Sequence, residues 1–450
     1  MTHCYKLMEK NIVVDAFSAS IHVVDDVAFD VIGMYENSSA EEITALMLNK
    51  YKADKTVTPS ALQELYSDLE ALRQARQLFA ADVSEEVPEE PDGGVIKALC
   101  LHMAHTCNLV CDYCFAGQGR YHGKDALMSL EVAKSAIDFL IKNSGTRVNL
   151  EVDFFGGEPL LNWDVLKETV KYAREIEGKH GKNIRFTLTT NGVRLDDEVT
   201  EFCNREISNV VLSLDGRPET HDARRKTPSG GGSYDLIVPK FKRFAEQRSG
   251  GYYMRGTYTS QNKDFLSDIL HIADLGFAEL AMEPAVSAEG DPLGLTEADL
   301  PELFGQYEQL AHTMAQRQRD GNPFTFYHYT LNLEDGPCAY KRARGCGSGS
   351  EYFAVTPEGT LYPCHQLVGE EEFIAGNVTV GVKDGYTFRR AGINARAECR
   401  DCWAKLYCSG GCAANAYHST GNVDGVYKLG CELFKKRLEC AIWLKCEEAE

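Results

Sequence analysis

Three closely spaced cysteines are the residues of this sequence best suited to chemistry. Cys107, Cys111 and Cys114 fall in the segment CNLVCDYC, directly after an apolar run that begins at Ala98, and the next cysteine, Cys203, is far downstream. Thiolates are soft ligands that suit iron–sulfur clusters, and a [4Fe–4S] cluster normally takes four of them. A triplet without a nearby fourth cysteine would leave one iron open for a substrate or cofactor. Structural zinc is the alternative, but zinc sites are closed by four ligands, usually in two separated pairs.

Length, charge and cysteine content limit the class of protein. The 450 residues are enough for two or three domains with a large core. No apolar run approaches the length of a membrane span, and the start MTHCYKLMEKN does not resemble a signal peptide, so we expect a cytoplasmic protein without a membrane partner. Sixteen cysteines in such a chain favour metal ligation or redox chemistry over disulfides. A formal net charge of −20 argues against nucleic-acid binding.

The middle of the chain alternates short β-rich runs with amphipathic stretches at helical spacing. This alternation predicts parallel strands joined by helices. Six units are too few for an eight-fold barrel, so we expect an α/β fold with a partial (β/α)6 TIM-type barrel over residues 95–285. Chemistry in such barrels gathers at the carboxyl ends of the strands. The expected strands are 96–103, 148–155, 184–189, 210–214, 252–259 and 277–282.

Polar turns follow three of these strands. The second expected strand ends in GGEP at Gly156–Pro159, the third in TNG at Thr190–Gly192, and the fourth in SLDG at Ser213–Gly216. Each turn alone is an ordinary connection, because Gly, Asn and Asp are common turn residues. Three such turns on the same rim as the cysteine triplet indicate a site.

The triplet and these turns together resemble the radical S-adenosylmethionine (SAM) enzymes. Their signature is C-x3-C-x2-C with an aromatic residue before the third cysteine, which here is Tyr113. The resemblance covers residues 95–285 and implies a [4Fe–4S] cluster on Cys107, Cys111 and Cys114, whose open iron binds SAM. It also implies these SAM contacts: Gly156, Gly157, Glu158 and Pro159 at the methionine amine, Tyr113 and Phe115 at the adenine, Asn191, Ser213 and Asp215 at the ribose or nearby polar groups, and Arg225 at the carboxylate.

Seven further cysteines form an array near the carboxyl terminus. A zinc ribbon would use four of them and leave three thiols idle. The array is similar to the SPASM extension of radical SAM enzymes, which we expect over residues 338–450 with two auxiliary [4Fe–4S] clusters. Cys338 either supplies a fourth ligand to the first of them or packs as a small apolar residue, and the first cluster then keeps an open iron. The resemblance assigns Cys346, Cys364 and Cys412 to the first cluster, and Cys399, Cys402, Cys408 and Cys431 to the second.

Residues 1–81 form a separate expected unit, a hairpin followed by three helices at 27–35, 41–48 and 59–79. This order suggests a winged-helix-like domain. As a DNA-binding domain it would lack a basic recognition helix, whereas an exposed strand edge can bind an extended peptide. We therefore expect a precursor-peptide recognition domain. An acidic linker at 82–94 would follow it, and a helical bridge at 286–337 would join the barrel to the C-terminal domain.

The whole chain is similar to the SCIFF-type peptide maturases, a group of thioether-forming sactisynthases and ranthipeptide synthases. The segments KALCLHMAHTCNLVCDYCFAG and LEVDFFGGEPL carry this resemblance. It implies intramolecular crosslinks from cysteine sulfur to an acceptor carbon in a cysteine-rich precursor with a leader sequence, with flavodoxin or ferredoxin as electron donor. The nearest alternative is an anaerobic sulfatase-maturing enzyme that makes formylglycine. A redox-sensing, DNA-binding regulator with iron–sulfur clusters is an alternative from another class. No general base is assigned.

Overall fold

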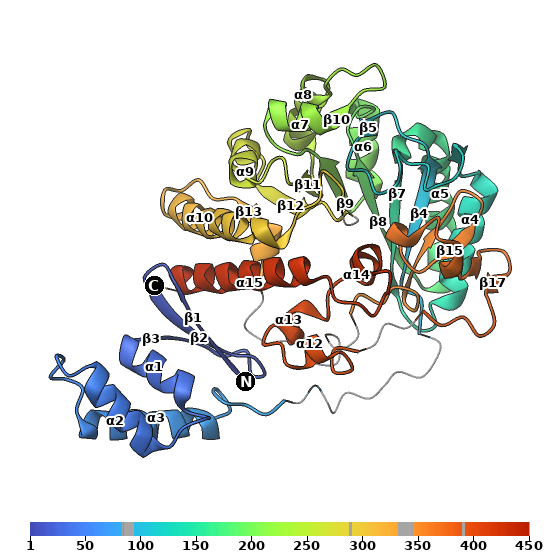
Figure 1. Ribbon diagram of the computed structural model, residues 1–450. Helices are drawn as coiled ribbons and strands as arrows, with labels where there is room; N and C mark the ends of the chain where they lie inside the picture. Colours follow the sequence, from blue (N-terminus) through green and yellow to red (C-terminus); the bar gives the residue numbers. More distant parts are fainter. Residues whose placement is uncertain are drawn as a thin grey trace.

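The computed structural model describes residues 1–82, 84, 94–287, 290–331, 342, 345–388 and 392–449. A sheet of parallel strands organises the middle of the chain (Figure 1). Each of its six main strands pairs in parallel with the next, which confirms the expected parallel sheet, and the short β13 (Thr325–Phe326) extends it beyond β12. The main strands are β4 (Ala98–His105), β7 (Asn149–Gly156), β8 (Asn183–Thr190), β9 (Asn209–Ser213), β11 (Gly251–Tyr258) and β12 (Glu279–Pro284).

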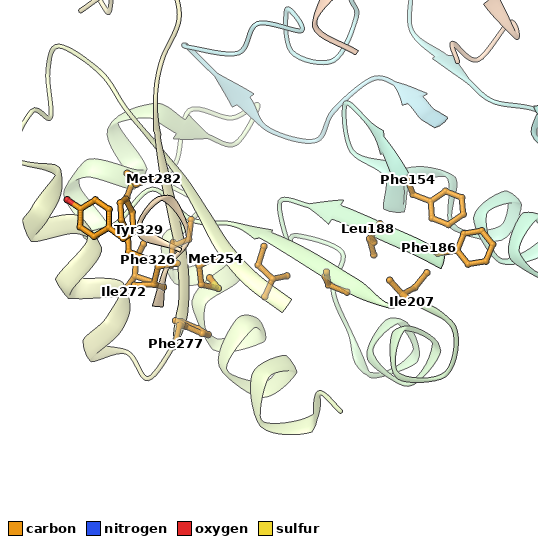
Figure 2. Close-up of a cluster of buried hydrophobic side chains, with 14 of the residues drawn as sticks. Phe154, Phe186, Leu188, Ile207, Met254, Ile272, Phe277, Met282, Phe326 and Tyr329 are labelled. Atoms are coloured by element: carbon orange, nitrogen blue, oxygen red, sulfur yellow. The ribbon is translucent and has the colours of Figure 1, made fainter. Parts of the chain in front are cut away.

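Helices connect these strands and cover one face of the sheet. Polar caps start two of them, because Ser129 and Asp196 accept hydrogen bonds from the first helical turns. Apolar side chains from alternate strand positions pack under the helices, and Figure 2 shows part of this core around Phe154, Phe186 and Leu188. The intervening positions, such as Thr187 and Ser213, fall on the opposite face. The helices are α4 (Leu130–Asn143), α5 (Trp163–Glu177), α6 (Asp197–Glu206), α7 (Pro218–Arg224), α8 (Tyr234–Gln247) and α9 (Phe265–Asp274).

The C-terminal segment continues the same sheet. Strand β14 (Tyr352–Val355) pairs in parallel with β4, and β15 (Thr360–Tyr362) pairs antiparallel with β14. Residues that the sequence places in the C-terminal domain therefore lie directly beside the first barrel strand. The remaining C-terminal elements are β16 (Gly376–Asn377), β17 (Gly381–Val382), α12 (Ala397–Arg400), α13 (Lys405–Cys408), α14 (Ala413–Thr420) and α15 (Lys428–Glu448), and α10 (Leu300–Arg319) lies alongside α15.

The N-terminal unit is a three-stranded antiparallel sheet followed by three helices. The strands run in the order β1-β2-β3, so β3 is at one edge. The expected hairpin and helices are present, β1 is additional, and α3 ends earlier than expected, before Arg76 and Phe79, which have positive φ. A capping box between Ser39 and Glu42 starts α2. The elements are β1 (Thr2–Leu7), β2 (Lys10–Asp15), β3 (Ile21–Val24), α1 (Asp26–Met34), α2 (Ala40–Lys50) and α3 (Pro59–Gln74).

Within the part of the chain that the structure describes, no helix combines the length and apolar character needed to cross a membrane. The linker expected at 82–94 lies almost wholly outside the described residues, as do residues 332–337 of the expected bridge.

Candidate active site at the carboxyl ends of the strands

The cysteine triplet lies in the loop that leaves the carboxyl end of β4. Its short strand β5 (Val110–Cys111) pairs antiparallel with β10 (Arg225–Lys226), so Arg225 lies opposite Cys111. Burial and the neighbouring Glu158 raise the pKa of Cys107 to about 12, and burial raises that of Cys111 to about 11 against the opposing effect of Arg225. Both thiols therefore hold their protons in the metal-free chain, and cluster binding must displace those protons.

The two glycines of the GGEP turn lie tightly against this loop. The Gly157 N–H donates to the carbonyl of Ala104 at 2.8 Å, and the Glu158 N–H donates to that of Thr106 at 3.0 Å. A Cβ atom at position 157 would lie only 2.1 Å from the Thr106 carbonyl oxygen, so no larger residue fits there. The glycines thus bring the end of β7 into direct backbone contact with the start of the cysteine loop.

Glu158 joins the ends of β7 and β8. Its side chain is fully buried and accepts hydrogen bonds from the Leu160 N–H at 3.1 Å, the Thr190 hydroxyl at 2.8 Å and the Asn191 N–H at 2.8 Å. Burial raises the pKa of this carboxyl, and the hydrogen bonds oppose the rise.

Asn191 continues these contacts to the cysteine loop. Its side-chain amide donates to Asn108 Oδ1 at 2.8 Å and to Cys107 Sγ at 3.5 Å. Two of the polar turns that the sequence singled out therefore meet at the first cysteine.

The turn after β9 meets the cysteine loop through a buried trio of side chains. The Tyr113 hydroxyl donates to Asp215 Oδ2 at 2.6 Å and accepts from Arg225 Nη1 at 2.7 Å, while Asp215 Oδ1 accepts from the Thr257 N–H at 3.1 Å. Asp215 is only 1% exposed, and its second oxygen lies 3.9 Å from Arg225. The adjacent Arg224 instead bonds Asp112 at 2.7 Å. In this arrangement Asp215 and Arg225 hold the cysteine loop through the Tyr113 hydroxyl.

Replacing Asp215 by asparagine tests this support. The change leaves Arg225 as a buried cation without its carboxylate, and breaking a buried pair in this way costs about 3–5 kcal/mol. We expect denaturant unfolding to show a loss of that order and equilibrium dialysis to show weaker SAM binding. Asp112→Asn is the matched control, because the Asp112–Arg224 pair is more exposed and is expected to contribute less than about 1 kcal/mol. Equal losses in the two variants would contradict the role given to Asp215.

Sequence reasoning missed an aromatic group between the cysteine loop and Cys364. The buried His102 and His105 lie 3.1 Å apart between Nδ1 and Nε2, and Tyr121 lies against both rings at centroid distances of 4.5 and 4.7 Å. Burial lowers the pKa of His105 to about 4, so its ring is neutral at pH 7. His365, next to Cys364, lies 5.9 Å from the Phe115 ring, which is 47% exposed. Side chains along 98–105 alternate between the two faces of the strand, so His102 falls on the face opposite the apolar one. This alternation was the signal in the sequence that could have revealed the aromatic group.

Several of the C-terminal thiols lie near one another. Burial and the nearby thiols of Cys408, Cys399 and Cys402 raise the pKa of Cys431 to about 12. Burial and the nearby thiols of Cys412 and Cys346 likewise raise the pKa of Cys364 to about 12. Cys338 lies outside the described residues.

The donor chemistry of these groups fits iron–sulfur clusters. Their expected ligands are all thiols, the donors that such clusters take. Among the residues that the structure describes, no three His, Cys, Asp or Glu side chains converge closely enough to bind a single metal ion.

Comparison with known proteins assigns the class. A model of the radical SAM superfamily matches residues 101–269. The cysteine-type anaerobic sulfatase-maturating enzyme of Clostridium perfringens is 23% identical over 74% of this chain and 93% of its own. Two solved structures share the fold. One, anSMEcpe with bound AdoMet, has a TM-score of 0.67 and 19% identity over 79% of this chain and 96% of that one. The other, Streptococcus suis SuiB bound to precursor peptide SuiA, has a TM-score of 0.52 and 15% identity over 95% of this chain and 98% of that one.

The matched region, with the cysteine loop at its start, is a radical SAM domain. This protein is therefore an enzyme with a radical SAM domain, a domain that binds SAM and a [4Fe–4S] cluster, and the solved structures that share its fold include one with bound AdoMet and one with a bound precursor peptide.

Proposed function

We propose that this enzyme forms intramolecular thioether crosslinks in a ribosomally made, cysteine-rich precursor peptide. The observation that carries the proposal is the N-terminal sheet, which has an edge strand and belongs to a chain that SuiB matches over 95% of its length. The sulfatase-maturase structure leaves more of the chain unmatched, with 79% covered. A unit that binds a leader peptide has a purpose in precursor maturation, whereas formylglycine formation needs none.

The edge strand β3 suits an extended peptide. Val23 on this strand is 49% exposed, and a peptide that adds a strand here would gain main-chain hydrogen bonds. In the proposed organisation, residues 1–81 recognise the precursor and a linker at 82–94 connects them to the barrel at 95–285. A helical bridge at 286–337 then joins the barrel to the SPASM domain at 338–450.

Each set of thiols is assigned one of the proposed iron–sulfur clusters. Cys107, Cys111 and Cys114 would hold the cluster that binds SAM, with the GGEP turn, Tyr113, Phe115, Asn191, Ser213, Asp215 and Arg225 around it. Cys346, Cys364 and Cys412, with or without Cys338, would hold the first auxiliary cluster, and Cys399, Cys402, Cys408 and Cys431 the second. When bound, SAM and its cluster supply a 5′-deoxyadenosyl radical, using an electron from flavodoxin or ferredoxin.

The chain's own residues position the reaction rather than perform it. The Glu158 and Asn191 contacts fix the strand ends against the cysteine loop, and the Tyr113–Asp215–Arg225 trio fixes the loop from the other side. Closing one crosslink breaks a C–H bond and an S–H bond and forms a C–S bond. One hydrogen atom would leave with deoxyadenosine and the thiol proton would leave to solvent. The one electron that remains would need an acceptor, which clusters held by the C-terminal thiols would supply.

Formylglycine formation is the second candidate, because the higher of the two TM-scores belongs to the sulfatase-maturase. A DNA-binding regulator does not fit the enzyme class.

The product decides between the two candidates. We expect reconstituted enzyme, SAM and a short cysteine-rich peptide encoded beside its gene to yield a peptide lighter by two hydrogen atoms per crosslink, because each crosslink removes one from carbon and one from sulfur. Mass spectrometry after alkylation should show one cysteine protected for each loss, and fragmentation should show a ring. A peptide with that cysteine changed to serine is the control. An aldehyde that hydrazine traps, or full alkylation of every cysteine, would overturn the proposal.

A further inference from the structure

The N-terminal sheet packs against the segment that carries the second group of C-terminal thiols. Strands β1 and β2 pass beside α15 and close to α12 and α13 (Figure 1). The thiols Cys399, Cys402 and Cys408 lie on or between α12 and α13, and Cys431 lies in the first turn of α15. Two of the contacts between the two units involve side chains close in sequence to these cysteines.

His3 on β1 makes the first contact. Its ring stacks on Trp403 with centroids 3.9 Å apart and planes 6° apart, and its Nε2 lies 2.9 Å from Glu439 Oε1. The Tyr5 hydroxyl donates to the Glu439 carbonyl at 3.0 Å. Trp403 directly follows Cys402, and Glu439 lies on α15, the helix that carries Cys431 in its first turn. The first strand of the N-terminal sheet therefore contacts the residue after Cys402 and a residue further along the helix that carries Cys431.

Lys405 makes the second contact. It is only 2% exposed, although it carries a charge, and it lies between Cys402 and Cys408. Its ammonium pairs with the Asp82 carboxylate and lies 5.3 Å from the centre of the Phe17 ring. Phe17, from the turn after β2, also packs against the apolar cluster that contains Cys399. Phe17 of the N-terminal unit supplies the ring, and Asp82, directly after that unit, supplies the anion, and together they make burial of this cation tolerable.

The segment that contains α12 and α13 lies between these contacts and is not stable on its own. Helices α12 and α13 have four residues each, far below the length at which a helix is stable alone. Four thiol ligands on one cluster would fix this segment in place. Contacts from His3, Phe17 and Asp82 order the same segment. Cluster binding therefore lowers the entropic cost of forming these contacts, and the contacts lower the entropic cost of binding the cluster, because such coupling is reciprocal.

We propose that the second auxiliary site and the N-terminal unit are one cooperative element: binding of the cluster by Cys399, Cys402, Cys408 and Cys431 orders the N-terminal sheet, and with it the β3 edge offered to the precursor. This regulation rests on the proposed function of that edge. The coupling itself needs no peptide, so it can be tested separately from the thioether reaction.

Hydrogen exchange of the full chain, reconstituted anaerobically with iron and sulfide, tests the coupling. We expect amides of β1 and β2 to exchange at least about tenfold faster in Cys402→Ala than in the wild type, because the segment that holds them loses a ligand. Cys346→Ala, which removes a thiol of the first group, is the matched control and should leave this exchange unchanged. Unchanged β1 and β2 exchange in Cys402→Ala, or equal acceleration in both variants or over the whole chain, overturns the proposal.

Reciprocity provides a second test from the other side. His3→Ala is expected to speed the loss of about four irons to a chelator, because the Trp403 and Glu439 contacts no longer support the thiol segment. His22→Ala is its control, since His22 on β3 contacts the Gln77 carbonyl and not the C-terminal segment. Identical release of all iron in the wild type and both variants means that the two units are independent.

Discussion

Simultaneous replacement of Cys107, Cys111 and Cys114 by alanine is expected to abolish SAM cleavage and to remove about four of about twelve irons. All three thiols lie in the loop that Asn191, Asp215 and Arg225 hold against the strand ends. The loop offers no other cysteine, so its cluster cannot form with substitute ligands. Iron analysis and chromatography of 5′-deoxyadenosine, both after anaerobic reconstitution, measure the two losses.

Cys203→Ala is the control for this triple variant. Cys203 is fully buried in α6 and belongs to none of the three thiol groups, so its loss should leave the iron content and SAM cleavage unchanged. The cluster assignment fails if the wild type binds stoichiometric zinc without iron-dependent absorbance, or if the triple variant still cleaves SAM.

The central sheet was predictable because its signals are local. Each main strand carries apolar residues at alternate positions, and each connecting helix carries apolar residues at helical spacing. Strand β13 has only two residues, and β14 lies about 250 residues after the strand with which it pairs. Neither the short strand nor the distant pairing leaves a periodic pattern in the sequence. The continuation of the barrel sheet into the C-terminal segment therefore appears only in the structure.

The candidate site was predictable in its members but not in their contacts. The turns at Gly156, Asn191 and Asp215 were recognisable from composition and from their place after strands. That Glu158 joins two turns, or that Arg225 reaches Tyr113, depends on how loops from different strands meet. Residues far apart in the sequence, such as His3 and Trp403, give no local signal of their contact.

The thiols of the second auxiliary group are expected to serve crosslinking and not SAM cleavage. Cys408 lies at the end of α13, and the thiols that raise its pKa, after burial itself, are Cys402 and Cys399. The groups that hold the cysteine loop come instead from the ends of β7, β8 and β9. Cys408→Ala should therefore leave peptide-independent formation of 5′-deoxyadenosine intact.

Crosslinking in the same variant is expected to fall at least about 100-fold, the upper range for loss of groups that support a metal site. The reason is that the electron left after C–S bond formation loses its acceptor, and the segment that orders the N-terminal sheet loses a ligand. Paired chromatography of deoxyadenosine and mass spectrometry of the peptide separate the two activities in one reaction mixture. Cys446→Ala, on α15 but in neither C-terminal thiol group, should retain both. Full crosslinking by Cys408→Ala, or equal loss of both activities, would show that the second group does not act after SAM cleavage.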